Sequence, residues 1–328
     1  MMSQSPQELG GPERVVKVLG AMERYMNNVP GYKRGHARGV AFHGHFTPTA
    51  EVAELTTAEL FRGDRIDAVV RLSNGGASPY LPDRVSGKRG NPLGLGVRFE
   101  LPSGDHSTWT ALNLAAFPPH TPDDFRAMVT NTRAALPGGS PNPLLMLAFI
   151  APRIPWTLPG IKAAAALAPP KSFATARFNG FHAYYLVDAD GRRRAFRFRW
   201  MPVAGIENID PKDDTLLPPQ YVLSEIKQRV ARCPVAWKLV FQMAQDGDEI
   251  DDLTRLWPES RPQVVAGQLV IDRLHEDPEL VDGWVFDPTR MPPGIALSDD
   301  PLLHFRSEAY WESHRRRTSE TKPAIVPE

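Results

Sequence analysis

Short runs rich in Val, Phe and Tyr limit the fold of this chain more than any other feature of its sequence. Each run ends at Gly, Pro, Asn or Asp, which is the pattern of β-strands joined by turns. Helices do not alternate regularly with these runs and no glycine-rich phosphate loop is present, so we do not expect a doubly wound parallel sheet. We predict an α+β fold in which helices surround an antiparallel sheet or barrel. The predicted strands span residues 67–72, 96–101, 183–187, 195–200 and 268–271.

A β-hairpin is the clearest local element. A strand at 184–187 leads into the turn sequence Asp-Ala-Asp-Gly at 188–191. In the strand that follows, Phe196, Phe198 and Trp200 alternate with two arginines. The apolar side chains would face the core and the charged ones would face outward, which predicts antiparallel pairing.

Helical spacing of apolar residues marks three further segments. The second of them starts at Thr121, whose side chain can cap a helix. The third contains Pro234, which predicts a break within it. The predicted helices span residues 13–28, 121–136 and 221–245.

The most apolar stretch, residues 143–170, contains Arg153, Lys162 and several prolines. These interruptions leave no run of about 20 apolar residues, the length that spans a bilayer. We therefore expect short packing helices here and no stable membrane span. For the whole chain we expect an N-terminal helical arm at 1–30, one domain at 31–317 and a disordered tail at 318–328.

The charge balance and the cysteine content indicate which partners and which cellular compartment to expect. Lys and Arg total 38, and so do Asp and Glu, so no overall field attracts nucleic acid or an acidic membrane. The single cysteine, Cys233, excludes an intramolecular disulfide and suits a reducing compartment. The first residues do not form the apolar segment of a secretory signal. We expect a cytoplasmic protein without a nucleic-acid partner.

Residues 35–46 hold three histidines and form the first candidate for chemistry. On an extended segment His43 and His45 share one face, as in some metal sites, but carboxylate or cysteine partners with zinc-site spacing are missing nearby. His36 lies between two small residues and could instead contact a flat ligand and act as general acid and base. Taken alone, these residues favour a structural histidine.

The second candidate is the segment 306–317, Arg-Ser-Glu-Ala-Tyr-Trp-Glu-Ser-His-Arg-Arg-Arg. On a helix, Arg306 and Tyr310 are four positions apart and share a face. A guanidinium beside a phenol favours the phenolate, the form that ligates ferric iron. Taken alone, the arginine run is typical of a solvated helix face.

Together, the two segments resemble the distal and proximal motifs of the haem catalase family. His-Ala-Arg-Gly starting at His36 resembles the distal-histidine motif, and Arg306-x-x-x-Tyr310 matches the proximal motif. Met-Pro-Pro-Gly-Ile at 291–295 is a specific family sequence. The resemblance covers roughly residues 30–317. Other matching segments follow the order of the family, at residues 71–73, 91–99, 109–117, 178–181, 195–200, 256–258 and 286–288.

The resemblance implies an eight-stranded antiparallel β-barrel with helices outside it and one haem b. Tyr310 would be the axial ligand of the iron, and Arg306 would keep it deprotonated. His36 would move a proton between the two oxygens of a peroxide, so that the O–O bond breaks heterolytically and a ferryl haem forms. Asn113 would orient the peroxide, and Ser73 would fix the tautomer of His36.

Further family positions surround the haem. Lys33 and Arg34 are alternative partners for one haem propionate, together with Arg71 and Arg317. Phe117 and Phe125 would line the distal side, and His314 keeps the spacing of the proximal motif.

The chain departs from the family in three ways. It stops soon after the proximal helix, so we expect neither the additional helical and flavodoxin-like parts nor their NADPH site. The family's arginine before the distal histidine falls on Lys33, next to Arg34. Its histidine behind the proximal arginine is expected at Tyr184, whereas His182 lies two residues earlier, which leaves that relay open.

A shortened catalase should expose its haem more than a full-length one. We therefore expect a peroxidase that reduces hydrogen peroxide and organic hydroperoxides, takes electrons from small aromatic donors and has weak catalase activity. Apolar surface that the missing parts would cover predicts a homodimer. Two alternatives stay open: a haem-dependent hydroperoxide isomerase or dehydratase of the allene oxide synthase kind, and a non-enzymatic haem-binding protein.

Overall fold

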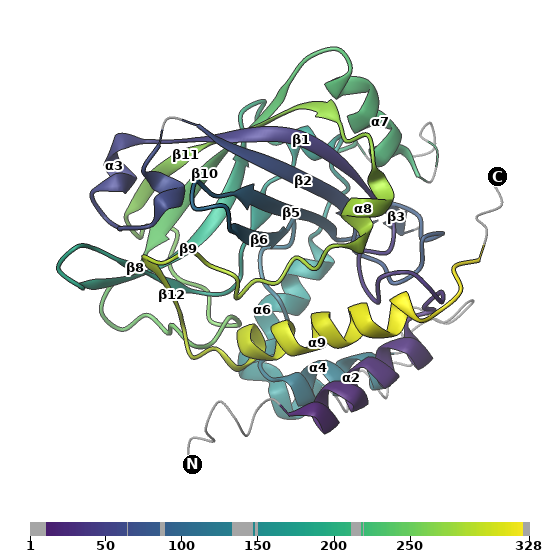
Figure 1. Ribbon diagram of the computed structural model, residues 1–328. Helices are drawn as coiled ribbons and strands as arrows, with labels where there is room; N and C mark the ends of the chain where they lie inside the picture. The colour runs from purple at the N-terminus through teal and green to yellow at the C-terminus, as the bar shows by residue number, and fades with distance from the viewer. Residues whose placement is uncertain are drawn as a thin grey trace.

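An antiparallel β-barrel occupies the centre of the computed structural model (Figure 1). The structure describes residues 11–63, 65–85, 89–132, 147, 150–210, 218 and 220–323. Eight strands form the ring, in the spatial order β10 (Val235–Met243), β11 (Gln263–Leu274), β1 (Gly39–Pro48), β2 (Ile66–Asn74), β5 (Leu93–Glu100), β6 (His106–Leu112), β7 (Phe178–Asn179) and β9 (Arg193–Pro202). Antiparallel pairing of β9 with β10 closes it. The predicted eight-stranded antiparallel barrel is therefore confirmed.

Smaller elements surround the barrel. β8 (Tyr184–Val187) and β12 (Ile295–Leu297) extend the sheet beyond β9, and β3 (Arg84–Val85) pairs with β4 (Arg89–Gly90). The helices are α2 (Pro12–Tyr25), α3 (Ala50–Ala53), α4 (Pro122–Thr132), α6 (Ile154–Ala165), α7 (Tyr221–Val230), α8 (Pro278–Gly283) and α9 (Pro301–Thr318), with 3-10 turns η1 (Glu59–Phe61), η2 (Ala151–Arg153) and η3 (Phe173–Thr175).

Aromatic side chains fill the interior of the barrel. The ring centroids of Trp109 and Phe198 are 4.7 Å apart, and those of Phe196 and Phe241 are 4.3 Å apart. Such packing leaves no room for a flat cofactor inside the ring of strands. A site must therefore lie outside the barrel interior. The largest fully buried side chains are Trp109, Trp200, Trp237, Phe42, Phe46, Phe61, Phe99, Phe173, Phe178, Phe196, Phe241 and Leu60.

A β-bulge bends β1 where it pairs with β11. The register shifts between His43 and Gly44. A Cβ atom at position 44 would lie 2.0 Å from the carbonyl oxygen of Val270, so only glycine lets the two strands approach. Bulges increase the local twist, which helps a sheet to close into a barrel.

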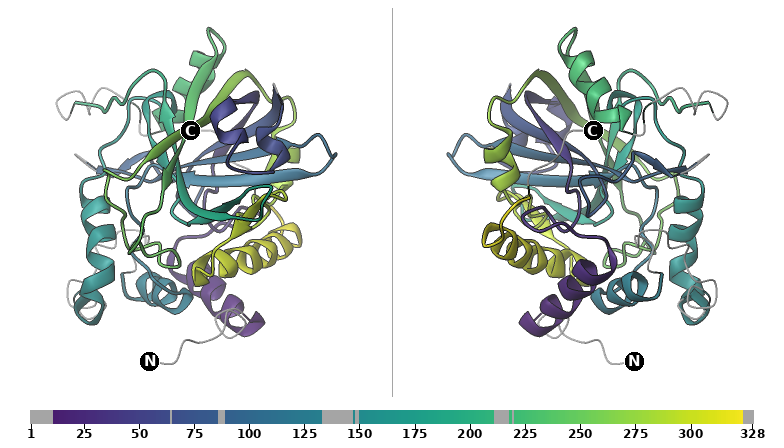
Figure 2. Two further views of the ribbon diagram at one scale, coloured as in Figure 1. Left: turned by 90° about the vertical axis from the view of Figure 1, so that its left-hand side faces the viewer. Right: turned by 90° about the vertical axis from the view of Figure 1, so that its right-hand side faces the viewer.

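Three helices form a layer on one side of the barrel (Figures 1 and 2). α9 lies next to the barrel, and α2 and α4 pack on the other side of α9. The side chain of Asp300 caps α9 by accepting a 2.9 Å hydrogen bond from the Leu302 amide. This layer fixes α9 against the barrel. Its separate apolar core consists of Val15, Val18, Leu19, Leu253, Leu302, Phe305 and Ala309.

Most of the predicted local elements occur. The hairpin at 184–200 is confirmed, because β8 and β9 pair antiparallel with Tyr184 opposite Phe196. The helices predicted at 13–28 and 121–136 correspond to α2 and α4, although residues 133–136 lie outside the described part of the chain.

The second half of the helix predicted at 221–245 is wrong. α7 ends at Val230, and after Pro234 the chain forms β10. The apolar residues Trp237, Leu239 and Phe241 are buried at every second position, which is the period of a strand. The proline therefore marks a change of element type and not a break within one helix.

The apolar stretch forms α6, which contains Pro159, preceded by η2. Among the described residues, none of the helices combines the length and apolar character needed to cross a bilayer. Residues 324–328 lie outside the described part. The expectation of a disordered tail does not fit residues 318–323, since Thr318 ends α9 and Glu320 forms an ion pair with Arg34.

Candidate functional site

The two sequence segments that resemble the catalase motifs meet at one side of the barrel. His36 precedes β1, Ser73 and Arg71 lie on β2, and Arg306 and Tyr310 lie one turn apart on α9. The charges of both arginines act on the imidazole of His36. Residues that are far apart in the sequence thus form a single site between the barrel and α9.

His36 is held as a neutral imidazole. Burial, followed by the positive charges of Arg71, Arg306 and Lys33, lowers its pKa from the ordinary value to about 3. Its Nδ1 atom lies 2.9 Å from the hydroxyl oxygen of Ser73. A neutral imidazole carries one N–H, so a hydrogen bond from Nδ1 to Ser73 leaves Nε2 as a proton acceptor.

The backbone and the ring of His36 are both constrained. Its φ angle of 58° lies in the left-handed region, which is unusual for a residue other than glycine. Arg71 Nη2 donates a 3.0 Å hydrogen bond to the His36 carbonyl oxygen. The ring lies directly over Gly94, where a Cβ atom would be 2.5 Å from Nδ1 and Cε1. The backbone of His36 is thus held by Arg71, and its ring is held by Ser73.

The phenol oxygen of Tyr310 accepts two hydrogen bonds from Arg306. Nη2 donates over 2.7 Å and Nε over 3.1 Å, and Nη2 also donates to the hydroxyl of Thr110 over 2.9 Å. Burial alone would lower the pKa of Arg306, but the neighbouring phenol oxygen raises it. A guanidinium can only donate, so the Tyr310 oxygen is the acceptor in both hydrogen bonds.

Three basic side chains gather at the end of α8. Arg71 Nε lies 2.9 Å from the Asp282 carboxylate, Arg317 donates to the Asp282 carbonyl over 2.7 Å, and Lys33 donates to the Trp284 carbonyl over 2.8 Å. Burial, then the charges of Arg71 and Arg317, lower the pKa of Lys33 well below its ordinary value. Among the contacts just given, these three basic side chains share one carboxylate, that of Asp282. They could therefore also bind the carboxylates of a ligand. The sequence did not identify Asp282, because no pattern placed α8 beside β2.

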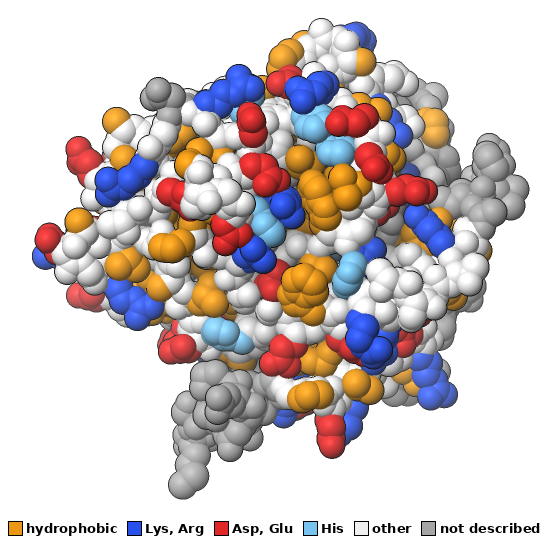
Figure 3. Space-filling view, in the orientation of Figure 1, with side chains coloured by type: hydrophobic (Ala, Val, Ile, Leu, Met, Phe, Trp, Pro, Cys, Tyr) orange, Lys and Arg blue, Asp and Glu red, His pale blue; other side chains and the backbone are white. Residues whose placement is uncertain are grey.

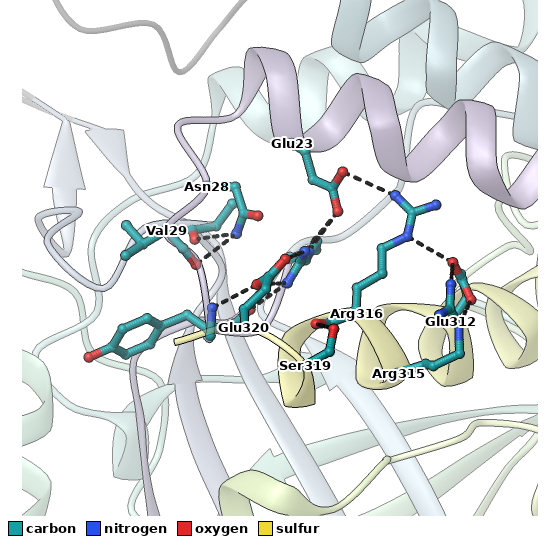
Figure 4. A network of polar contacts seen from close by, with 12 residues as sticks. Glu23, Asn28, Val29, Glu312, Arg315, Arg316, Ser319 and Glu320 are labelled. Carbon is teal, nitrogen blue, oxygen red and sulfur yellow. Dashed lines mark hydrogen bonds and ion pairs between the residues drawn. The ribbon is translucent and has the colours of Figure 1, made fainter. Parts of the chain in front are cut away.

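Arg34 lies in a different network, which ties α2 to the end of α9. Its Nη2 pairs with Glu23 over 2.8 Å, and its guanidinium also binds the Glu320 carboxylate. Figure 4 shows how Glu23 also contacts Arg316, over 3.0 Å, and how Arg316 contacts Glu312, over 2.8 Å. With two carboxylates of its own, Arg34 has no need of a ligand's charge.

Comparison with known proteins decides the family. The catalase family matches residues 22–325 of this chain. The chain belongs to the catalase family. It is 30% identical over 307 residues to the catalase-related peroxidase of Synechococcus elongatus, covering 92% of this chain and 88% of that protein. A catalase-related peroxidase of Mycolicibacterium paratuberculosis is 30% identical over 298 residues, covering 91% and 93% of the two chains. The protein is thus an oxidoreductase of this family.

Solved catalase structures share the fold. A fungal catalase superposes with a TM-score of 0.74 at 21% identity, covering 91% of this chain and 61% of that chain. Catalase A from Saccharomyces cerevisiae gives a TM-score of 0.73 at 19% identity, with 91% and 63% covered. This catalase-family chain therefore spans about three-fifths of the length of each of these two proteins.

A buried histidine and aspartate lie behind Arg306. His182 Nδ1 is 2.8 Å from Asp300 Oδ2, and both side chains are almost fully buried. Tyr184, the other residue considered for this family position, is not part of this pair, since its hydroxyl donates to the Pro288 carbonyl over 3.0 Å. The sequence did not identify Asp300, because its partner lies 118 positions away along the chain. Burial lowers the pKa of His182, and the positive charge of Arg306 lowers it further.

The other predicted residues take positions around these groups. Asn113 follows β6, and its Oδ1 accepts a 2.7 Å hydrogen bond from the Leu93 amide. Phe117 lies between Phe125 and a third phenylalanine, with ring centroids 6.1 and 5.7 Å apart, beside the core of the helical layer. His314 Nδ1 lies 3.0 Å from Arg317 Nη2.

The donor set fits the haem that the catalase family uses as its cofactor. Ferric haem in catalases takes a tyrosinate ligand, and the doubly hydrogen-bonded Tyr310 oxygen offers that donor. A neutral imidazole is available at His36, and the cations near α8 match two propionates. Gly94 leaves room for the imidazole, so the residues present are consistent with the group.

The alternative metal site on β1 does not have suitable geometry. His43 comes near His275 and Glu276, whereas His45 is not part of this group. The rings of His43 and His275 are stacked, with centroids 4.3 Å apart and planes at 15°. Nitrogen lone pairs lie in the ring plane, so two parallel rings cannot direct them at one ion.

Proposed function

We propose that this catalase-family protein is a haem-dependent peroxidase that reduces hydrogen peroxide and organic hydroperoxides and has weak catalase activity. The observation that carries the proposal is the neutral imidazole of His36 in one site with the Arg306–Tyr310 pair. Peroxide cleavage needs a base to move the proton and an electron-rich ligand on the iron. The names of two relatives, both catalase-related peroxidases, support the same choice.

The cofactor we infer is haem b. Tyr310 would ligate the iron, and Lys33, Arg71 and Arg317 would bind the propionates through charge-assisted hydrogen bonds. When bound, the haem supplies the iron at which the peroxide O–O bond is cleaved and the oxidising equivalents are stored. Arg34, whose partners are Glu residues, would not take part.

The proton path runs through His36. Nε2 would take the proton of one peroxide oxygen and return it to the other oxygen, which would leave as water or an alcohol. Ser73 would accept a hydrogen bond from Nδ1 and so keep a proton on that nitrogen. Asn113 orients the peroxide through its Nδ2–H groups, because its Oδ1 atom is held by the Leu93 amide.

Electrons would come from small aromatic donors, which complete the peroxidase cycle. A homodimer and a cytoplasmic location remain predictions from the sequence. Sedimentation of the purified protein and fractionation of the producing cells test them.

The decisive experiment compares wild-type protein with His36→Ala after both are loaded with haem. We expect wild-type protein to oxidise a phenol with either hydrogen peroxide or an alkyl hydroperoxide. The variant should lose a hundredfold to ten-thousandfold in kcat/KM, the usual contribution of a general acid–base group, roughly estimated. The ferric absorption spectrum should keep its proximal-ligand character, since Tyr310 is unchanged.

Product analysis separates the alternatives. Release of an epoxide or ketone from a lipid hydroperoxide without any electron donor would identify an isomerase or dehydratase. Haem binding without peroxide turnover would identify a non-enzymatic haem protein. Either result contradicts the proposed peroxidase.

A further inference from the structure

Trp311 differs from the other tryptophans in its exposure. The chain has seven tryptophans, all within the described residues, and Trp311 is the exposed one, at 51%. It follows Tyr310 directly on α9, a helix that Figure 1 shows beside the barrel. Hydrophobic side chains on the face seen in Figure 3 form small groups between charged ones. An indole beside the proposed iron ligand is therefore accessible from solvent.

A buried carboxylate holds the indole in place. Trp311 Nε1 donates to Asp287 Oδ2 over 3.1 Å, and Ser307, one turn earlier on α9, donates to the same oxygen over 2.5 Å. The amide and hydroxyl of Thr289 donate to the other carboxylate oxygen over 2.9 and 2.7 Å. Asp287 is 6% exposed. The indole consequently has a fixed orientation.

The charge of Asp287 favours oxidation of the indole. All of its partners above are neutral donors, and in the described part of the chain no Lys or Arg forms a salt bridge with it. A negative charge next to an aromatic ring stabilises the positive charge that the ring acquires when it loses an electron. The carboxylate can also accept the Nε1 proton that an oxidised indole releases.

Two contacts connect Trp311 with the interior. It is bonded through the backbone to Tyr310. Its ring also meets the edge of the His314 ring, with centroids 6.0 Å apart, and His314 Nδ1 lies 3.0 Å from Arg317 Nη2. Arg317 belongs to the cationic group near α8. A chain of close contacts thus runs from the solvent-exposed indole to both ends of the site.

We propose that Trp311 is a surface oxidation site for aromatic reductants that are too large to reach the cofactor, an inference that rests on the proposed peroxidase function. In each step one electron passes from the indole to the cofactor oxidised by peroxide, and the Nε1 proton moves to Asp287. A phenol at the surface then supplies one electron and one proton. The electron reduces the indole, the Asp287 proton returns to Nε1, and a phenoxyl radical leaves. Two such steps use the two oxidising equivalents of one peroxide. The two protons from the phenols complete one water, and the other peroxide oxygen has already left as water or an alcohol.

The test compares one phenol in two sizes, free in solution and tethered to a large dextran. With haem-loaded Trp311→Phe, we expect kcat/KM for the tethered phenol to fall by about tenfold or more and that for the free phenol to change less than about twofold. Tyr80→Phe removes a similarly exposed phenol at another site and serves as the matched control, with no change for either form.

A second readout needs no added reductant and uses haem-loaded protein. Wild-type protein treated with peroxide and a spin trap, without reductant, should carry the trap adduct on Trp311 in peptide mass spectra. An unchanged rate with the tethered phenol in Trp311→Phe, or no adduct on Trp311, would overturn the inference. If wild-type protein oxidises the free but not the tethered phenol, the inference fails while the peroxidase function stands. If it oxidises neither, the proposed function itself fails and the inference with it.

Discussion

The distal and proximal sides of the site are built on different parts of the fold. On the distal side, Ser73 and Gly94 belong to the barrel, whose aromatic interior is fully buried, and His36 lies beside them just before β1. On the proximal side, Arg306 and Tyr310 belong to one helix, which a small apolar core and an N-cap hold in place. The barrel strands hold the neutral imidazole of His36. The helix α9 brings Arg306 and Tyr310 together because they are four positions apart. Proton transfer and charge stabilisation thus depend on separate supports.

Replacing the proximal guanidinium should have the largest effect. Arg306→Met removes two hydrogen bonds to the Tyr310 oxygen and one to Thr110. Because bonds to a charged group are involved, we expect the free energy of unfolding to fall by about 2–3 kcal/mol. Urea unfolding of the haem-free protein measures this loss. Haem added to the variant should give an altered ferric spectrum.

Arg306→Lys is the matched control for this change. It keeps the positive charge but cannot donate two N–H groups in a fixed fork. Its stability and spectrum should fall between those of wild-type protein and Arg306→Met. If Arg306→Met kept the wild-type spectrum, Arg306 would not be needed to support Tyr310, and the described difference between the distal and proximal sides would be contradicted.

Neighbouring basic residues offer a smaller and more selective test. Lys33→Ala should weaken haem binding about tenfold, since one charge-assisted hydrogen bond to a propionate is lost. Arg34→Ala should leave haem affinity unchanged and lower the free energy of unfolding instead, because Arg34 binds Glu23 and Glu320. Haem titration followed by absorbance, with urea unfolding of both variants, checks the pair. If Arg34→Ala weakened haem binding and Lys33→Ala did not, Arg34 and not Lys33 would be the residue that binds a propionate.

The pH profile should show almost no effect above pH 5. Burial and three positive neighbours lower the pKa of His36 to about 3, so the imidazole remains a base at higher pH. We expect kcat/KM for hydrogen peroxide to be flat from about pH 5 to 8. A decline towards acid pH with a midpoint near about 6.5, the ordinary histidine value, would contradict the neutral distal side.

The same pKa shift predicts how stability depends on pH. The unfolded chain binds a proton at His36 below about pH 6.5, whereas the folded protein does not until about pH 3. His36 therefore contributes full stability above pH 6.5 and loses it as the pH falls towards 3. His36→Gln should remove this component of acid unfolding.

The sequence revealed those parts of the molecule that depend on short-range patterns. Alternation of apolar and charged residues predicted the hairpin of β8 and β9, and the four-residue spacing predicted the Arg306–Tyr310 pair. The sequence did not reveal that the chain changes from helix to strand after Pro234, since buried strands and helices have similar composition.

Parts that depend on long-range contacts were not predictable from residue types. Lys33 and Arg34 are adjacent, and which of them faces the site is decided by Glu320, 286 positions from Arg34. His182 is held by Asp300, at a distance of 118 positions. Resemblance to the catalase family supplied the functional positions, and the tertiary contacts then distinguished between neighbours.

The most direct test is the visible absorption spectrum of haem-loaded protein beside that of Tyr310→Phe. We expect wild-type protein to give a high-spin ferric spectrum of the tyrosinate type, and the variant to lose it or to bind haem weakly, because the phenol oxygen is the proposed iron ligand. Protein that takes up no haem, or a spectrum that is the same in Tyr310→Phe, would contradict the account and leave only the fold.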